Sequence, residues 1–171
     1  MEGPLSAAMN LTDLILTGHH AVLRIGIHQD VLKPYFLWYT TEVHPDGGAL
    51  GCEVEIDHLR FSIGLDRTGS ITHWVLKQSL QDHSFLFTTG NKEIRLGDID
   101  AFGLLRILEE LRVPYTREIW GNDVCVVTIL QSGVSLSFDL APSIARGPAS
   151  IQLSEIPLYI GGDVFRKLKY E

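Results

Sequence analysis

Histidines and aspartates are the residues of this sequence best suited to metal chemistry. Imidazole nitrogens and carboxylate oxygens bind zinc, iron and manganese, and three pairs bring them close together: His28 with Asp30, Asp57 with His58, and Asp82 with His83. If a strand passes through His28, then His28 and Asp30 lie on one face. A metal-binding or hydrolytic site is therefore one interpretation of the sequence, and its candidate ligands are His19, His20, His28, Asp30 and His44. No H-E-x-x-H or C-x-x-C spacing accompanies them.

The sequence contains no recognisable motif for covalent catalysis. Cys52 lies on the apolar side of an alternating segment and Cys125 lies among valines, so we expect two buried, unreactive thiols. Residues 64–70 have the glycine spacing of a phosphate-binding loop, but Ser70 stands where the lysine is required, which favours a hairpin turn. We accordingly predict no catalytic residue and no cofactor.

The distribution of charge points to a partner. No Lys or Arg occurs between residues 34 and 59, whereas this stretch contains five carboxylates, Glu42, Asp46, Glu53, Glu55 and Asp57, and the aromatic residues Trp38 and Tyr39. Fixed charge beside aromatic side chains combines electrostatic steering with the residue types that dominate binding energy at interfaces. We predict that these seven residues form a surface that binds a basic protein, with Glu53, Glu55 and Asp57 together on the exposed side of a β-layer.

Most of the chain shows the two-residue period of β-strands. Apolar residues alternate with polar ones, or aromatic and β-branched residues cluster, and the turns between these segments are rich in Gly, Asp and Asn. The expected strands cover residues 20–28, 35–44, 51–57, 59–65, 71–76, 85–88, 93–96, 115–120, 124–130 and 134–140. The segment 35–44 is apolar on both faces at its start, which is typical of a central strand.

Three segments favour helices. Residues 98–112 place five apolar residues on one stripe, begin at Asp98 as a cap and end before Pro114. Residues 5–17 predict a short helix that ends before Gly18. The tail, residues 151–171, predicts one short strand and a terminal helix. Strands joined by short turns imply an antiparallel sheet that helices cover on one face. We therefore predict an α+β fold, with a mainly antiparallel sheet of about eight or nine strands, one central amphipathic helix (98–112) and short terminal helices.

Length and composition exclude several classes of protein. The 171 residues fit a single globular domain spanning 1–171. Fourteen Lys and Arg against 21 Asp and Glu give a net charge of −7, which argues against nucleic-acid binding. No apolar run approaches the roughly 20 residues that span a bilayer, so no membrane partner is expected. Residues 4–17 lack the basic start of a signal peptide, and a cytoplasmic location follows.

These observations lead to one preferred function and two alternatives. We expect a non-enzymatic protein-interaction domain for a basic protein partner; an acidic inhibitor, such as an immunity protein that neutralises a toxin, is one instance of this class. The metal-binding protein or hydrolase described above is the first alternative. The second is a β-rich domain that binds a small molecule against aromatic residues such as Trp74 and Trp120.

Overall fold

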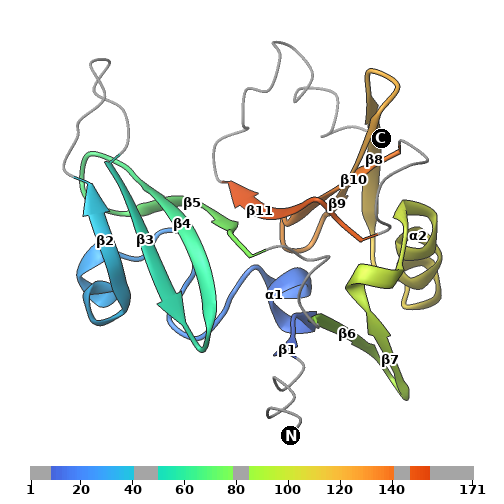
Figure 1. Ribbon diagram of the computed structural model, residues 1–171, viewed down its shortest axis with the longest axis horizontal. Coiled ribbons are helices and arrows are strands. Elements are labelled where there is room, and N and C mark those ends of the chain that lie inside the picture. Colours follow the sequence, from blue (N-terminus) through green and yellow to red (C-terminus); the bar gives the residue numbers. More distant parts are fainter. Residues whose placement is uncertain (1–8, 41–49, 79–84, 141–146, 155–171) are drawn as a thin grey trace, which may run out of the picture.

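The computed structural model describes residues 9–40, 50–78, 85–140 and 147–154. Within these residues the protein is β-rich, with eleven strands and two α-helices (Figure 1). Eight strands form one antiparallel sheet in the order β2-β3-β4-β5-β11-β10-β9-β8, and three form a small sheet in the order β1-β6-β7. The predicted α+β class with a mainly antiparallel sheet is confirmed at this level.

The elements have the following bounds. The large sheet contains β2 (Phe36–Thr40), β3 (Leu50–Ile56), β4 (Leu59–Leu65), β5 (Ile71–Leu76), β8 (Tyr115–Trp120), β9 (Val124–Ile129), β10 (Ser135–Asp139) and β11 (Ser150–Ser154). The small sheet contains β1 (Met9–Asn10), β6 (Phe85–Thr89) and β7 (Lys92–Arg95). The helices are α1 (Thr12–Thr17) and α2 (Ala101–Glu110), and three short 3-10 turns are η1 (Gln29–Val31), η2 (Lys33–Tyr35) and η3 (Leu96–Asp98).

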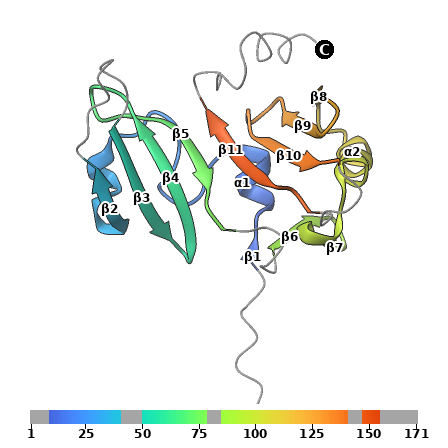
Figure 2. The same ribbon diagram turned by 45° about the horizontal axis from the view of Figure 1, so that its top comes forward.

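The large sheet consists of two four-stranded meanders. Strands β2 to β5 pair in chain order, and strands β8 to β11 do the same. The last strands of the two meanders, β5 and β11, pair antiparallel, with Val75 opposite Gln152, Trp74 opposite Leu153 and His73 opposite Ser154. This pairing joins the two meanders into one sheet, and α1 lies close to their junction (Figures 1 and 2).

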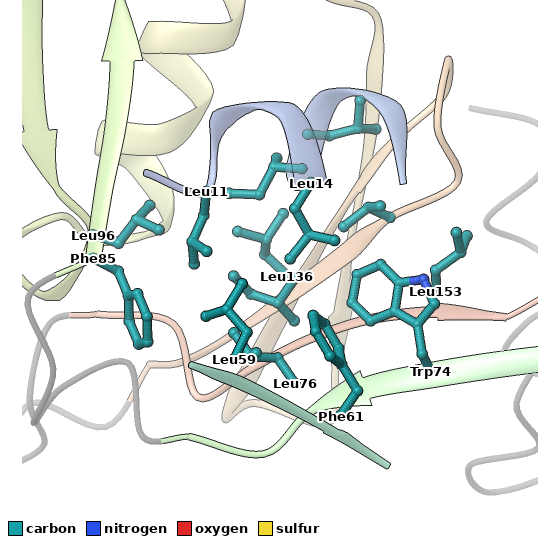
Figure 3. Packing of buried hydrophobic residues seen from close by; sticks show 14 of the residues in the cluster. Leu11, Leu14, Leu59, Phe61, Trp74, Leu76, Phe85, Leu96, Leu136 and Leu153 are labelled. Carbon is teal, nitrogen blue, oxygen red and sulfur yellow. The ribbon is translucent and has the colours of Figure 1, made fainter. Parts of the chain in front are cut away.

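One face of the sheet forms the hydrophobic core. Trp74 in β5 and Phe61 in β4 are completely buried, with their rings edge to face at 5.5 Å between centroids. Leu14 of α1 packs on this face near Trp74 and Leu153 (Figure 3). The small sheet adds Phe85 and Phe87 of β6 to the same cluster. Helix α2 adds its buried residues, which are Ala101, Leu104, Leu105 and Leu108. The core therefore includes residues of both meanders, α1 and α2.

Helix α1 is held by the turn between β9 and β10. Its C-cap, Gly18, has φ 74°, and the Gly18 N–H donates to the carbonyl of Leu14. The Ser132 hydroxyl donates to the carbonyl of Ile15 at 2.8 Å, and the Gln131 amide donates to that of Leu16 at 3.0 Å. Carbonyls at the end of a helix lack intrahelical partners, so these bonds fix α1 on the second meander. Of the predicted helix 5–17, residues 12–17 are helical, residues 9–10 are a strand, and residues 5–8 lie outside the described residues.

The predicted strand 20–28 is wrong. Leu23 is buried, and Ile25 and Ile27 pack against the core, which explains the alternation. The backbone, however, turns tightly between His20 and Leu23, whose backbone groups bond each other in both directions. Gly26 adds a positive φ of 90°. Burial alternates here in an irregular segment, and residues 26–29 hydrogen-bond to residues 69–71 without forming a regular strand.

Two further predictions need correction. Strand β2 lies at the edge of the described sheet, so the segment 35–44 does not supply a central strand. Helix α2 covers only residues 101–110, because Asp100 is the cap that accepts from the Gly103 N–H, while Asp98 belongs to η3. The helix lies at the β8 end of the molecule rather than at its centre (Figure 1). The short strand expected in the tail is β11, and the terminal helix expected after it falls outside the described residues.

None of the helices in the described part of the chain is long and apolar enough to cross a membrane.

The pairing of Gly64 with His73 gives a test of packing in the sheet. These residues are opposite each other in β4 and β5, and the imidazole ring of His73 fills the space that a Cβ at position 64 would take. We expect Gly64→Ala to lower the free energy of unfolding by about 1–3 kcal/mol, because the ring must move. Urea denaturation measures this. Removing the ring in Gly64→Ala/His73→Ala should recover part of the loss, and strictly additive effects of the two substitutions would contradict the contact.

Burial of His73 also predicts a pH dependence of stability. Burial holds the pKa of His73 below its ordinary value of 6.5. As the pH falls below that value, the unfolded chain takes up a proton here that the folded chain does not, so the free energy of unfolding falls between about pH 7 and about pH 5. His73→Gln should reduce this fall in urea titrations. His58→Asn, in an exposed turn, serves as the control and should retain the full fall. A full fall in His73→Gln would refute the assignment.

Candidate functional site

The acidic residues of β3 lie on the side of the strand that faces away from the core. Cys52, Val54 and Ile56 are buried, whereas Glu53 and Glu55 between them are partly exposed. In register, Trp38 of β2 is opposite Glu53. Tyr39 is opposite Cys52, one position along the ladder from the pair of Trp38 and Glu53. Glu42 and Asp46 of the predicted surface lie outside the described residues.

Asp57 was predicted to continue the row of acids on β3, but it lies just beyond the end of that strand. It lies in the turn between β3 and β4, where Asp57 and His58 both have positive φ, 52° and 67°. Its carboxylate is 3.2 Å from Nε2 of His20. On the strand itself, Glu55 lies 3.9 Å from Nε of Arg60. Asp57 and Glu55 thus each have a basic side chain nearby.

Two large apolar residues in β2 and in η1 are exposed. Leu37 is 44% exposed and stands where the β2–β3 register shifts between Phe36 and Trp38. Val31, in η1 just before β2, is 47% exposed. Among the described strands, none pairs with the outer edge of β2. We use the name acidic edge for five residues on β2, on β3 and in the segments next to them: Val31, Leu37, Glu53, Glu55 and Asp57.

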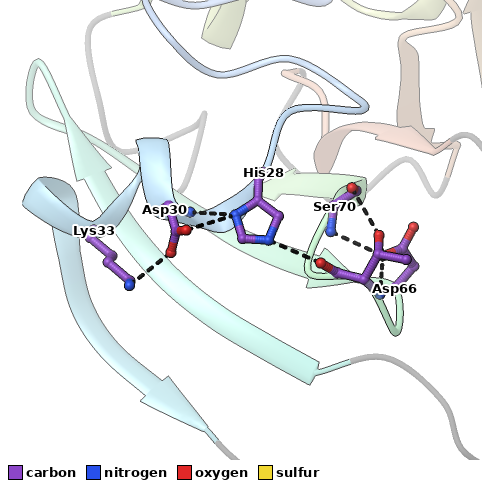
Figure 4. A network of polar contacts seen from close by, with 6 residues as sticks. His28, Asp30, Lys33, Asp66 and Ser70 are labelled. Carbon is purple, nitrogen blue, oxygen red and sulfur yellow. Dashed lines mark hydrogen bonds and ion pairs between the residues drawn. The ribbon is translucent and has the colours of Figure 1, made fainter.

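His28 links η1 to the turn between β4 and β5 (Figure 4). Its Nε2 lies 2.9 Å from the carbonyl oxygen of Thr68, and its Nδ1 accepts from the Asp30 N–H at 3.2 Å. One oxygen of the Asp30 carboxylate is 3.2 Å from Nδ1 of His28, and the other oxygen is 2.7 Å from Nζ of Lys33. The hydrogen bond from the Lys33 ammonium holds the pKa of Asp30 below its usual range. His28 therefore caps a short helix and does not continue a strand.

The same turn is organised by Asp66. Its carboxylate accepts from the hydroxyl and N–H of Thr68 and from the N–H of Ser70, at 2.6–3.0 Å. These hydrogen bonds, led by that of the Thr68 hydroxyl, hold the pKa of Asp66 below its usual range. Gly69 follows with φ 84°. The hairpin expected in place of a phosphate-binding loop is confirmed, since β4 and β5 flank the turn.

The candidate metal ligands in the described part of the chain do not all meet at one place. His20 pairs with Asp57, and His28 pairs with Asp30. His19 is exposed beyond the end of α1, and His44 lies outside the described residues. No group of three His, Cys, Asp or Glu side chains arranged for a metal ion occurs in the described part of the chain. The expectation that His28 and Asp30 share a face assumed a strand through His28, and the two side chains meet instead at the start of η1.

The two cysteines are both free and buried. Burial raises the pKa of Cys52 to about 11, and burial also raises the pKa of Cys125 above its usual value. Both thiols therefore stay protonated at neutral pH. Trp74, named for the small-molecule alternative, is a core residue packed against Phe61.

A second group of exposed residues was missed in the sequence. Four large apolar residues are exposed on α2, on β8 and in the turns beside them: Phe102, Leu111, Ile119 and Leu130. The available signal was Phe102, an aromatic residue outside the apolar stripe of α2. A helix pattern alone does not show that a strand lies beside this residue.

Comparisons with family models, with curated proteins and with solved structures found no match for this chain.

The contacts of His28 predict its role in stability. His28→Ala removes both the cap of η1 and the link to Thr68, and we expect it to lower the free energy of unfolding by about 1–2 kcal/mol. His28→Asn is the matched variant, because asparagine still caps a helix but does not reach Thr68. It should lose less than the alanine variant. Urea denaturation of both variants tests this, and an unchanged midpoint for His28→Ala would show that the contacts contribute nothing.

Proposed function

We propose that this chain is a non-enzymatic protein-interaction domain that binds a basic protein partner through the acidic edge. The observation that supports this most directly is the placement of Glu53 and Glu55 on the exposed side of β3, next to an edge strand that carries the exposed Leu37. An acidic inhibitor, of which an immunity protein is one example, is the kind of protein that such a surface suits.

Charge favours a basic partner. The whole chain carries a net charge of −7, so a basic protein is attracted from a distance. Carboxylates at the contact surface then guide the approach and fix the orientation, effects that raise association rates more than they raise affinity.

The ion pairs within the acidic edge are compatible with this role. Glu55 and Arg60 are 3.9 Å apart with both side chains partly exposed, and exposed pairs of this kind contribute little to stability. Glu55 can therefore exchange Arg60 for a basic residue of a partner at small cost. The exposed Val31 and Leu37 supply apolar area for contact with a partner, which ion pairs alone do not provide.

A first experiment is to identify the partner. We expect the tagged chain, purified from extracts of the cells that express it, to retain a protein of net positive charge. The double substitution Glu53→Lys/Glu55→Lys should then lower the association rate constant of the purified pair roughly tenfold at low ionic strength, because two attractive charges become repulsive. Stopped-flow or surface plasmon resonance kinetics at several salt concentrations measure this, and the salt dependence should weaken in the variant.

Two other variants make this result specific. Glu93→Lys/Asp98→Lys changes the net charge equally, but on exposed residues of β7 and η3, and should have a much smaller effect. Arg60→Gln should act in the opposite direction and raise the association rate, because it leaves Glu55 without its basic neighbour. A partner of net negative charge, or equal losses in the two double variants, would overturn the proposal.

A further inference from the structure

The region beside α2 contains a surface pocket of about 420 Å³. Its helix side is the stripe formed by Phe102, Leu105, Arg106 and Glu109, which are spaced i, i+3, i+4 and i+7. Its strand side is formed by Tyr115 and Arg117 of β8, which are two residues apart and so share one face of the sheet. The volume falls within the range of ordinary ligand pockets.

Two arginines give this pocket its charge. Within the described residues neither Arg106 nor Arg117 lies within 4.0 Å of a carboxylate. The one carboxylate of the lining, Glu109, accepts a hydrogen bond from the Tyr115 hydroxyl at 2.8 Å. The lining therefore has one positive charge in excess, in a protein whose net charge is −7. A guanidinium binds a carboxylate through two parallel hydrogen bonds, and the two arginines are suited to that geometry.

Apolar residues stand next to these charges. Phe102 in the pocket is 58% exposed, and Ile119, two residues beyond Arg117 in β8, is 56% exposed. Exposed aromatic residues and arginines are the residue types that carry most of the binding energy at protein interfaces. The ligand should accordingly combine acidic groups with apolar ones.

Strand β8 is the second edge of the large sheet. It pairs with β9 on one side, and no other described strand pairs with it. Alternate N–H and C=O groups of an edge strand point away from the sheet and can bind another extended chain. A peptide strand added there places every second side chain on the face of Tyr115 and Arg117, beside the pocket.

We infer that the α2–β8 pocket binds an extended acidic peptide segment of another protein, which adds to the outer edge of β8. A carboxylate of the peptide lies between Arg106 and Arg117, and the apolar side chain two residues along the peptide, on the same face, packs on Phe102 and Ile119. This site is separate from the acidic edge, which lies at the other end of the sheet (Figure 1).

The test uses an eight-residue probe peptide, blocked at both ends, in which glutamate and leucine alternate at every second position with threonine between them, so that both lie on one face of the added strand. The control peptide carries glutamine in place of each glutamate. Fluorescence anisotropy of labelled peptides should show the glutamate peptide binding at least about tenfold more tightly. Arg106→Gln/Arg117→Gln should abolish this preference, and Arg106→Lys/Arg117→Lys should keep part of it. Arg95→Gln, at an exposed arginine of β7, is the matched control and should leave the preference unchanged.

The peptide backbone gives a second, independent readout. N-methylation of alternate amides on the edge that faces β8 should abolish binding, whereas methylation of the other set should not, because only the first set bonds to the strand. Equal affinity for both peptides, equal losses in all arginine variants, or no effect of methylation would overturn the inference. Tighter binding of a single-stranded oligonucleotide, or self-association of the chain in sedimentation that Arg106→Gln/Arg117→Gln abolishes, would assign the pocket to a different occupant.

Discussion

The pairing of β5 with β11 is the contact on which the rest of the structure depends. Residues 73–75 and 152–154 are far apart in the sequence, yet their register joins two four-stranded meanders into one sheet. Trp74 and Leu153, opposite each other in this pairing, lie in the core together with Leu14 of α1. A single four-stranded meander would leave such large side chains in water, and burying them is the main favourable term in folding. The two meanders and α1 thus depend on each other for stability.

This arrangement leaves two edges, and both proposed binding surfaces lie there. Joining the meanders by their last strands makes β2 and β8 the ends of the sheet that the described residues form. Unpaired strand edges attract other chains, and proteins usually protect them with charge, bulges or a covering element. The β2 end has carboxylates and a register shift at Leu37, and the β8 end has Arg106 and Arg117 with α2 alongside. The charged residues named at the two ends are of opposite sign, so the two proposed partners differ in charge.

Much of the local structure could be predicted from the sequence. Alternation in β3 and β4, the Asp66–Gly69 turn and the meander from β8 to β10 follow from residue types and spacing, because side-chain period and turn chemistry are local properties. Two failures had local causes as well. Residues 20–28 alternate in burial without forming a strand, since the backbone turns tightly between His20 and Leu23 and has a positive φ at Gly26. Asp98 and Asp100 both suit a helix cap, and the hydrogen bond to Gly103 selects Asp100.

The candidate sites divide in the same way. The sequence by itself determined that Glu53 and Glu55 lie opposite the apolar side of their strand. Only the tertiary structure decided that β2 is an edge, that His28 reaches Thr68 forty residues away, and that Arg106 of a helix and Arg117 of a strand line one pocket. The physical reason is that alternation states which side of a strand is buried but not which strand pairs with it. Backbone hydrogen bonds are the same for every residue, so strand order is set by how the buried side chains pack across the whole core.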